Sequence, residues 1–248
     1  MSADGFERAM RAVAGVEGWL SDDQARRLYE RAAELRPPAR IVEIGSFRAR
    51  STIVLALAAP AGVEITAIDP HGGGDRGPQE IAAQPARGER DHEAFHANLR
   101  RAGVAGAVRH VRLPSREALG AFDGSVELLY VDGAHRYRPA RDDIAGWGAR
   151  VPAGGTLLVH DAWSSLGVTL ALLRLTVFGA RFRYAGRTGS LAEYRRERLS
   201  GTARRRNAVR QLAELPWFIR NLLVKAALLA RLRPLARLLG HRFGPWPY

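Results

Sequence analysis

The sequence predicts an α/β fold, a doubly wound and mostly parallel sheet of seven strands that ends in a C-terminal helical tail. Short apolar runs alternate with helical patterns through the first 195 residues, and such alternation is typical of parallel strands joined by helical crossovers. Several of the apolar runs stop directly at a carboxylate or a glycine. In an open parallel sheet ligands bind at this edge, so the residues there are candidates for chemistry.

The first elements have clear boundaries. Ser21 is a candidate N-cap followed by acids, which predicts a helix over 21–35. The segment "ARIVEIG" (39–45) predicts a strand, and "ARSTIVLALAA" (49–59) predicts the helix after it. A second strand is expected at "VEITAIDP" (63–70). The alternation therefore begins before residue 40 and follows the pattern of a parallel sheet.

Residues 71–90 are rich in Gly and Pro and lack periodicity. They are too long for a simple connection, so we expect a lid. The alternation then resumes, with a helix over 91–103, a strand over 107–113, a short helix after Ser115, a strand over 126–132, a helix over 139–150 and a strand over 155–161. Residues 179–186 and 190–196 are joined by "RTG" and predict a closing antiparallel pair.

A change in composition near residue 200 predicts a domain boundary. The net charge of the chain is +13, and residues 201–248 hold ten arginines and lysines against one acid, Glu214. We therefore expect an N-terminal helical segment (1–38), a central domain (39–198), and a basic linker followed by an apolar helical tail (199–248). The excess positive charge belongs mainly to the tail and says little about the substrate of the body.

Composition also excludes several classes of site and location. The chain has no cysteine, which excludes disulfides and thiolate metal sites. It has no signal-like N-terminus and no apolar run of about 18 residues, so we expect a cytoplasmic protein. For the tail, residues 202–248, we hypothesise peripheral attachment to an anionic membrane at its inner face, because Trp217 and Trp246 bound a basic apolar stretch. The alternative is a helix that packs on the body or on a second subunit of a homo-oligomer.

The turn after the first strand, "EIGSFRARST", distinguishes between cofactors. A dinucleotide fingerprint needs a second glycine so that the backbone can approach a pyrophosphate, and here Phe47 holds that position. This argues against a nicotinamide-dependent oxidoreductase and favours S-adenosylmethionine, which carries no phosphate. Asp69 stands 24 residues beyond Gly45, at the end of the second strand, where an acceptor for ribose hydroxyls is expected.

Four segments carry a resemblance to a known family: "VEIGSFRARSTIVLA", "ITAIDPHGG", "LLYVDGAHRYRPARDDIAGW" and "PAGGTLLVHDAW". Their order and spacing resemble the class I S-adenosylmethionine-dependent methyltransferases, and most of all the O-methyltransferase branch that includes macrocin-type and cephalosporin-pathway enzymes. The resemblance covers residues 35–195. It places Glu43, Gly45 and Ser46 beside the methionine part of the cofactor, Ser51 at the same helix start, Asp69 on the ribose and Ser115 near the adenine. Ala49 departs from the family, where glycine is common.

The resemblance also implies a metal-assisted mechanism. Asp132 and Asp161 match the family's ligands for a divalent metal, Mg or Mn, and His135 matches its general base. A divalent ion makes a hydroxyl easier to deprotonate, and an imidazole is a suitable acceptor for the proton. We also assign His160 as a softer ligand. Each residue has a structural alternative, as a capping or cofactor-bonding aspartate, a helix-start histidine packed on Tyr137, or a core histidine.

The expected activity is methyl transfer to a hydroxyl of a sugar, natural product or lipid-linked glycan. An RNA-directed methyltransferase is the main alternative, but its cations should surround the cleft, whereas here they lie in the tail. We therefore do not expect nucleic acid as a partner. Four other histidines, His71, His92, His96 and His110, have no recognisable pattern, although His71 and His92 flank the lid segment and could contact substrate.

Overall fold

The computed structural model describes residues 3–74 and 82–241 and contains a seven-stranded sheet in the order β3-β2-β1-β4-β5-β7-β6. The strands are β1 (Arg40–Ile44), β2 (Glu64–Ile68), β3 (Val108–Val111), β4 (Leu128–Val131), β5 (Thr156–Val159), β6 (Phe182–Thr188) and β7 (Leu191–Arg196). β1 to β5 pair in parallel, and β7 inserts antiparallel between β5 and β6. The predicted fold class is confirmed.

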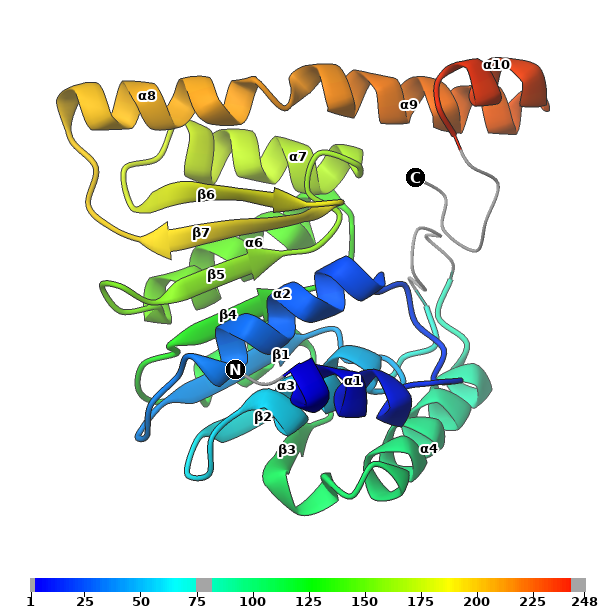
Figure 1. Cartoon of the computed structure of the whole chain (residues 1–248), viewed down its shortest axis with the longest axis vertical. Helices are drawn as coiled ribbons and strands as arrows, with labels where there is room; N and C mark the ends of the chain where they lie inside the picture. Colours follow the sequence, from blue (N-terminus) through cyan, green and yellow to red (C-terminus); the bar gives the residue numbers. More distant parts are fainter. Residues whose placement is uncertain (1–2, 75–81, 242–248) are drawn as a thin grey trace.

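Helices cover both faces of the sheet (Figure 1). The helices of one layer are α1 (Ala3–Ala12), α2 (Asp22–Ala33), α3 (Arg50–Ala58) and α4 (Pro85–Arg101), and those of the other are α5 (Ser115–Gly120), α6 (Tyr137–Gly146) and α7 (Leu166–Leu172). Short 3₁₀ turns follow α4 and α6, at Ala105–Ala107 and Trp147–Arg150. A π-helical turn, Leu173–Val177, extends α7. The two layers of helices place one apolar core on each side of the sheet.

The central strand β4 shows why the sheet needs two cores. Leu128 and Tyr130 pack into the core under α1 to α4, while Leu129 and Val131 pack into the opposite one. All four side chains are buried, because alternate residues of a strand face opposite sides and both sides are covered. The strand therefore appears in the sequence as an unbroken apolar run.

The expected start of α2 is confirmed at atomic detail. The Ser21 hydroxyl accepts a bond from the Gln24 amide, and the Gln24 side chain accepts one from the Ser21 amide at 3.0 Å. This reciprocal capping box satisfies two backbone donors at the helix start. It also fixes the Gln24 side chain, which reaches the candidate site.

The helix after the second strand begins at Pro85, whereas we expected it at Asp91. Proline suits the first turn of a helix, where its missing N–H costs nothing, so the Gly- and Pro-rich segment is shorter than predicted. Residues 75–81 of the expected lid lie outside the described residues.

The tail is helical from its start and packs on the body. It contains α8 (Gly201–Leu212), α9 (Leu215–Leu229) and α10 (Arg233–Leu238), and Figure 1 shows α8 and α9 running almost end to end beside α7. The segment expected as a basic linker is therefore a packed helix. Asn207 of α8 is buried, where it accepts a bond from the Tyr184 amide at 2.7 Å and donates to the Phe182 carbonyl at 3.1 Å. These bonds attach the basic helix to β6.

In the described part of the chain, no helix has the length and apolar character needed to cross a membrane.

Candidate active site

A cavity of about 420 Å³ opens at the C-terminal ends of β1, β2, β4 and β5. β1 and β4 are neighbours in the sheet although they are far apart in the chain, so this is a point where the winding direction reverses and where α/β sheets bind ligands. Among the predicted site residues, the cavity lining includes Gly45, Asp69, Ser115, Asp132, His135, His160 and Asp161.

Gly45 allows the β1 turn to lie against the end of β4. Its φ is +87°, and a Cβ atom there would lie 2.1 Å from the carbonyl oxygen of Asp132. Any larger residue would clash and would also be strained by the left-handed backbone. Ala49 at the start of α3 has φ of +72°, which explains why glycine suits this position in the family resembled.

Asp69 joins the two turns that border the cavity. Its carboxylate accepts a bond from the Phe47 amide at 2.8 Å and from the His71 amide at 2.7 Å. The His71 ring in turn contacts the Phe47 carbonyl at 2.8 Å. The cavity wall after β1 and the wall after β2 are thus held together by one carboxylate.

Three of the predicted cofactor residues, Glu43, Ser46 and Ser51, are buried but are not part of the described cavity lining. The Glu43 carboxyl accepts hydrogen bonds from the hydroxyls of Ser51 and Thr52. Burial raises the pKa of Glu43 to about 7, although these two hydroxyls act in the opposite direction. Glu43 and Ser51 therefore connect β1 to the start of α3 from beneath the cavity.

Ser115 lies against the cavity and is held by one side chain of α6 and one of the turn that follows α6. Its hydroxyl donates to the Asp143 carboxylate, and its carbonyl accepts a bond from the Trp147 indole at 3.2 Å. Burial raises the pKa of Asp143 to about 6, against the effect of the Ser115 bond.

Asp143, which was not among the predicted site residues, is buried and lines the cavity. The available signal was its spacing from Ala140 and Trp147, which places all three on one face of α6.

Two carboxylates and two imidazoles meet at the ends of β4 and β5. His135 Nε2 lies 2.9 Å from Asp161 Oδ2, and His160 Nδ1 lies 3.1 Å from Asp132 Oδ1 and 3.6 Å from Asp161 Oδ2. One ligand atom each of Asp132, His135 and Asp161 lies within 4.8 Å of the others, an arrangement that could hold a metal ion. The sequence therefore predicted a set of residues that the fold brings together.

The charges of this group depend on one another. Burial alone would lower the pKa of His135 and His160, but the neighbouring carboxylates outweigh it and raise both. Burial would raise the pKa of Asp161, but the two imidazoles hold it well below its usual range. Without a metal, the carboxylates therefore favour the protonated form of both imidazoles.

A second layer of side chains fixes this group. The Tyr130 hydroxyl donates to Asp132 at 2.9 Å, and the Ser164 hydroxyl donates to Asp161 at 3.0 Å. His160 Nε2 lies 3.3 Å from the Gln24 side-chain oxygen, so the capped helix α2 contacts the site. Gln24 was not predicted, since nothing in its local sequence indicates a partner more than a hundred residues away.

Residues 42–162 match a family model described as a methyltransferase domain. The chain therefore contains a methyltransferase domain. All of the strand-end residues discussed above, from Glu43 to Asp161, lie within the matched segment, and β1 to β5 fall almost wholly inside it. The matched segment therefore includes the cavity lining except for Trp19, whereas β6, β7 and the tail helices follow it.

The methyltransferase is similar in fold to several solved structures. The O-methyltransferase TomG from Streptomyces achromogenes, involved in tomaymycin synthesis and solved with S-adenosylmethionine, is 20% identical over 81% of this chain and 92% of TomG, with a TM-score of 0.51. An O-methyltransferase from Bacillus cereus in complex with S-adenosylhomocysteine is 14% identical over 79% and 92% of the two chains (TM-score 0.53). The O-methyltransferase NovP is 16% identical over 72% and 81% (TM-score 0.58). At these identities the likeness establishes the shared fold.

Proposed function

We propose that this methyltransferase takes its methyl group from S-adenosylmethionine and transfers it to a hydroxyl oxygen. The observation that carries the proposal is the cavity at the β1/β4 reversal, with Asp69 on one side and the Asp132–His135–Asp161 group on the other. One side suits a nucleoside and the other suits a hydroxyl that must lose a proton. Similar structures solved with S-adenosylmethionine or S-adenosylhomocysteine support the choice of cofactor.

The turn after β1 fits a cofactor without phosphate. The Phe47 amide, which a pyrophosphate would need, is already bonded to Asp69, and Phe47 itself has a left-handed backbone with a bulky side chain. The buried Ser46 hydroxyl oxygen has no hydrogen-bond partner among the described residues. Because Ser46 does not line the cavity, a polar group of a bound ligand would satisfy this oxygen only after a movement of the turn that follows β1.

Asp69 can still serve the ribose. Each carboxylate oxygen accepts more than one hydrogen bond, so the backbone bonds from Phe47 and His71 leave capacity for two hydroxyls. These backbone bonds also fix the orientation of the carboxylate before a ligand arrives, which lowers the entropic cost of binding. S-adenosylmethionine, when bound, would supply an electrophilic methyl carbon.

His135 is the proposed general base. Its Nε2 pairs with Asp161, which leaves Nδ1 as the nitrogen that can accept the proton of the hydroxyl. Asp161 then orients the ring and stabilises the imidazolium that forms, as a carboxylate does in acid–histidine pairs. Residues held in this way place the two reactants together, and placement supplies much of the rate.

The same group fits a divalent metal. Asp132 and Asp161 offer hard oxygen ligands and His160, whose Nδ1 lies 3.1 Å from Asp132 and 3.6 Å from Asp161, offers a softer nitrogen. This mixed set suits Mn²⁺ at least as well as Mg²⁺. When bound, the metal would lower the pKa of a coordinated hydroxyl. The residues of the chain would keep their roles, with the carboxylates holding the ion and the second layer of Tyr130 and Ser164 fixing the carboxylates.

The acceptor is proposed to be a sugar, a natural product or a lipid-linked glycan, as in the macrocin-type branch that the sequence resembles. Trp19 and Phe47 line the same cavity, and their ring centroids lie 5.3 Å apart. Aromatic faces of this kind pack well against sugar and aromatic rings. This pair gives the acceptor a flat, apolar contact surface next to the proposed methyl donor.

The tail leads us to propose that the protein acts at an anionic membrane surface. One face of α9 packs on the body through buried Asn221, Val224 and Ala227, as the packing alternative requires. The outer surface of α9 and α10 exposes apolar side chains, and Leu229 and Leu238 are 86% and 84% exposed. We propose that this surface, together with the arginines of the tail, binds anionic lipid, because exposed leucines beside cations are typical of in-plane anchors. Trp246, the expected outer anchor, lies outside the described residues.

The experiment that tests the activity is transfer of labelled methyl from S-adenosylmethionine to a panel of glycosides, phenols and RNA, with and without chelator. We expect labelled O-methyl ethers of one of the first two classes. Transfer to RNA alone would replace the proposal by the RNA-directed alternative. Full activity in chelator would remove the metal and leave His135 and Asp161 as the proton-accepting pair.

A further inference from the structure

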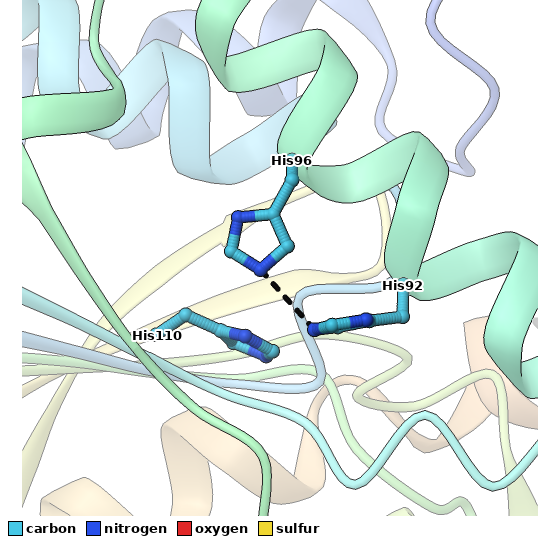
Figure 2. A group of neighbouring side chains, drawn as sticks. All are labelled: His92, His96 and His110. Atoms are coloured by element: carbon cyan, nitrogen blue, oxygen red, sulfur yellow. Dashed lines mark hydrogen bonds between the residues drawn. The ribbon is translucent and has the colours of Figure 1, made fainter.

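Three histidines form a second cluster that the proposed reaction does not use. His92 and His96 project from α4, and His110 projects from β3 towards them (Figure 2). One ring nitrogen of each lies within 4.8 Å of the other two. A fourth imidazole, His71, is adjacent, with its ring centroid 5.3 Å from that of His92 and 5.1 Å from that of His110.

The local structure explains why these side chains meet. His92 and His96 are four residues apart, so they lie on one face of α4, one turn above the other. α4 leads into β3 through a short turn, Ala105–Ala107, and it lies beside the edge of the sheet that β3 forms. The helix pair and the strand histidine therefore come from adjacent elements whose backbones are fixed by packing.

Several ring nitrogens of the cluster have lone pairs available to a metal ion. His92 Nε2 lies 3.2 Å from His96 Nε2, so only one of the two carries a hydrogen and the other accepts it. His110 bonds to the backbone of Asp69, and its Nε2 is buried with no hydrogen-bond partner in the described residues. Burial and the neighbouring imidazoles lower the pKa of His110 to about 4 and also lower that of His96. Neutral imidazoles with available lone pairs are what a metal ion requires.

We propose that His92, His96 and His110 bind a zinc ion or a similar borderline dication, each through one ring nitrogen. Three imidazoles without a thiolate suit zinc, and zinc–nitrogen bonds of about 2.0–2.1 Å place tetrahedral ligands about 3.3 Å apart. The His92–His96 separation of 3.2 Å already fits this geometry, and His110 has to approach by a small side-chain movement. A dication would take the place of the shared proton between the two helix histidines.

The surroundings supply the supporting contacts that zinc histidines usually have. The His92 Nδ1 atom lies 3.5 Å from a Glu89 oxygen, and His110 bonds to the Asp69 backbone. A carboxylate and a carbonyl on the outer ring nitrogens fix the tautomer that leaves the inner nitrogens free for metal. Arg112 lies 3.3 Å from the same Nδ1 atom of His92 and can only donate to it, so metal binding through Nε2 requires Arg112 to leave His92 for Glu89, with which it is already paired at 2.5 Å.

The fourth position has a candidate within the protein. His71 is buried, and its Nδ1 lacks a hydrogen-bond partner among the described residues while its Nε2 bonds to the Phe47 carbonyl. Water would complete a tetrahedron, as would His71 after a side-chain movement, because its nitrogens are not among those within 4.8 Å of one another. Because His71 and Asp69 also line the cofactor cavity, the metal would connect α4 and β3 to the turn that carries Asp69. The ion would therefore be structural, and it would fix one wall of the cavity.

The test uses the full chain, freed of metal with chelator and then titrated with Zn²⁺ by calorimetry and with Co²⁺ by visible absorption. Asp132→Asn is included to weaken the other candidate metal group, so that the two sites are distinguished. We expect the absorption of tetrahedral Co²⁺ in the wild type and in Asp132→Asn. Replacement of His92, His96 or His110 by alanine should weaken Zn²⁺ binding by more than about 100-fold, because loss of a ligand should exceed the 10- to 100-fold cost of losing a supporting contact.

His241→Ala is the matched control, because His241 is also buried but follows α10, and it should bind Zn²⁺ like the wild type. In the Asp132→Asn background, Zn²⁺ should also raise the melting temperature of the protein with the intact histidine cluster and not that of the three cluster variants. No tetrahedral Co²⁺ spectrum in the wild type, or a spectrum that disappears in Asp132→Asn and persists in the cluster variants, would overturn the proposal. The Asp132→Asn titration decides the question even if a cluster variant fails to fold.

Discussion

The Lys225 ammonium donates a hydrogen bond of 2.8 Å to the carbonyl oxygen of Ser164, in the loop that carries Asp161. Asn221, one turn earlier on α9, donates to the Trp163 carbonyl at 3.2 Å. Asp161 and Trp163 both have positive φ, 52° and 59°, and non-glycine residues hold such conformations only where their surroundings impose them. The tail helix is therefore one of the elements that hold Asp161 in the site.

Lys225→Met should destabilise the protein and impair catalysis more than cofactor binding. The change leaves the Ser164 carbonyl without this donor, at a cost of about 1–3 kcal/mol in the free energy of unfolding. We expect a lower kcat and an unchanged affinity for S-adenosylhomocysteine, measured by steady-state kinetics and calorimetry. Arg210→Met, at an exposed position of α8, is the control and should leave both quantities as in the wild type. Equal kcat for the two variants would mean that the tail does not position the loop.

Asp69→Ala should weaken the binding of S-adenosylhomocysteine by at least about 1–3 kcal/mol, because two ribose hydroxyls would lose their acceptor. The change also removes the acceptor of the Phe47 and His71 amides, so stability must be measured in parallel. Asp69→Asn keeps one acceptor oxygen and should lie between the alanine variant and the wild type. Calorimetric affinity equal to that of the wild type in a folded Asp69→Ala protein would reject the ribose assignment.

His135→Ala should reduce the rate by roughly 100- to 10,000-fold, the usual range for a general base, and spare cofactor affinity. The pH profile gives a sharper test. Asp161 raises the pKa of His135, and a base acts only when unprotonated, so metal-free activity should rise with pH through a range above the ordinary imidazole value. Asp161→Asn should move this limb of the profile to lower pH. If activity rises over the same pH range in Asp161→Asn as in the wild type, the His135–Asp161 pair does not control the rate.

Glu43→Gln should alter how stability depends on pH. The pKa of Glu43 rises from 4.5 to about 7 on folding, so between these values the folded state binds more protons than the unfolded state. Stability contributed by Glu43 is therefore lost as pH rises through this window, by up to about 3 kcal/mol. The glutamine variant lacks this loss, and its free energy of unfolding relative to wild type should increase from pH 4.5 to 8 in urea titrations. A constant difference across that range would contradict the protonation of Glu43.

Replacement of Leu229 and Leu238 by glutamate should abolish binding to anionic vesicles in sedimentation assays. Both side chains are almost fully exposed, so the fold should be retained, unlike in a truncation that would uncover the contacts of α8 and α9 with the body. High salt should weaken the wild-type interaction, because part of it comes from the arginines. If the double variant and the wild type partition equally, or if the wild type ignores anionic vesicles, the surface has another partner.

Local patterns determined the elements of this protein and the strand-end residues. The capping box at Ser21, the apolar strands and the carboxylates that end β2, β4 and β5 were all predicted from nearby sequence, because hydrogen bonds within a turn and the burial of a strand depend on adjacent residues. The parallel order then places Asp69, Asp132 and Asp161 at one edge of the sheet. The sequence by itself thus determined the fold class and most of the candidate site.

Tertiary structure alone decided which side chains meet across the fold. The spacing of His92 and His96 was visible in the sequence, but their meeting with His110 depends on how α4 packs beside β3. The burial of Asp143 and the contacts of Gln24 and Lys225 with the site likewise arise from packing between distant segments. Such contacts depend on the arrangement of whole helices and strands, which hydrophobic burial selects collectively. A local sequence pattern therefore does not predict them.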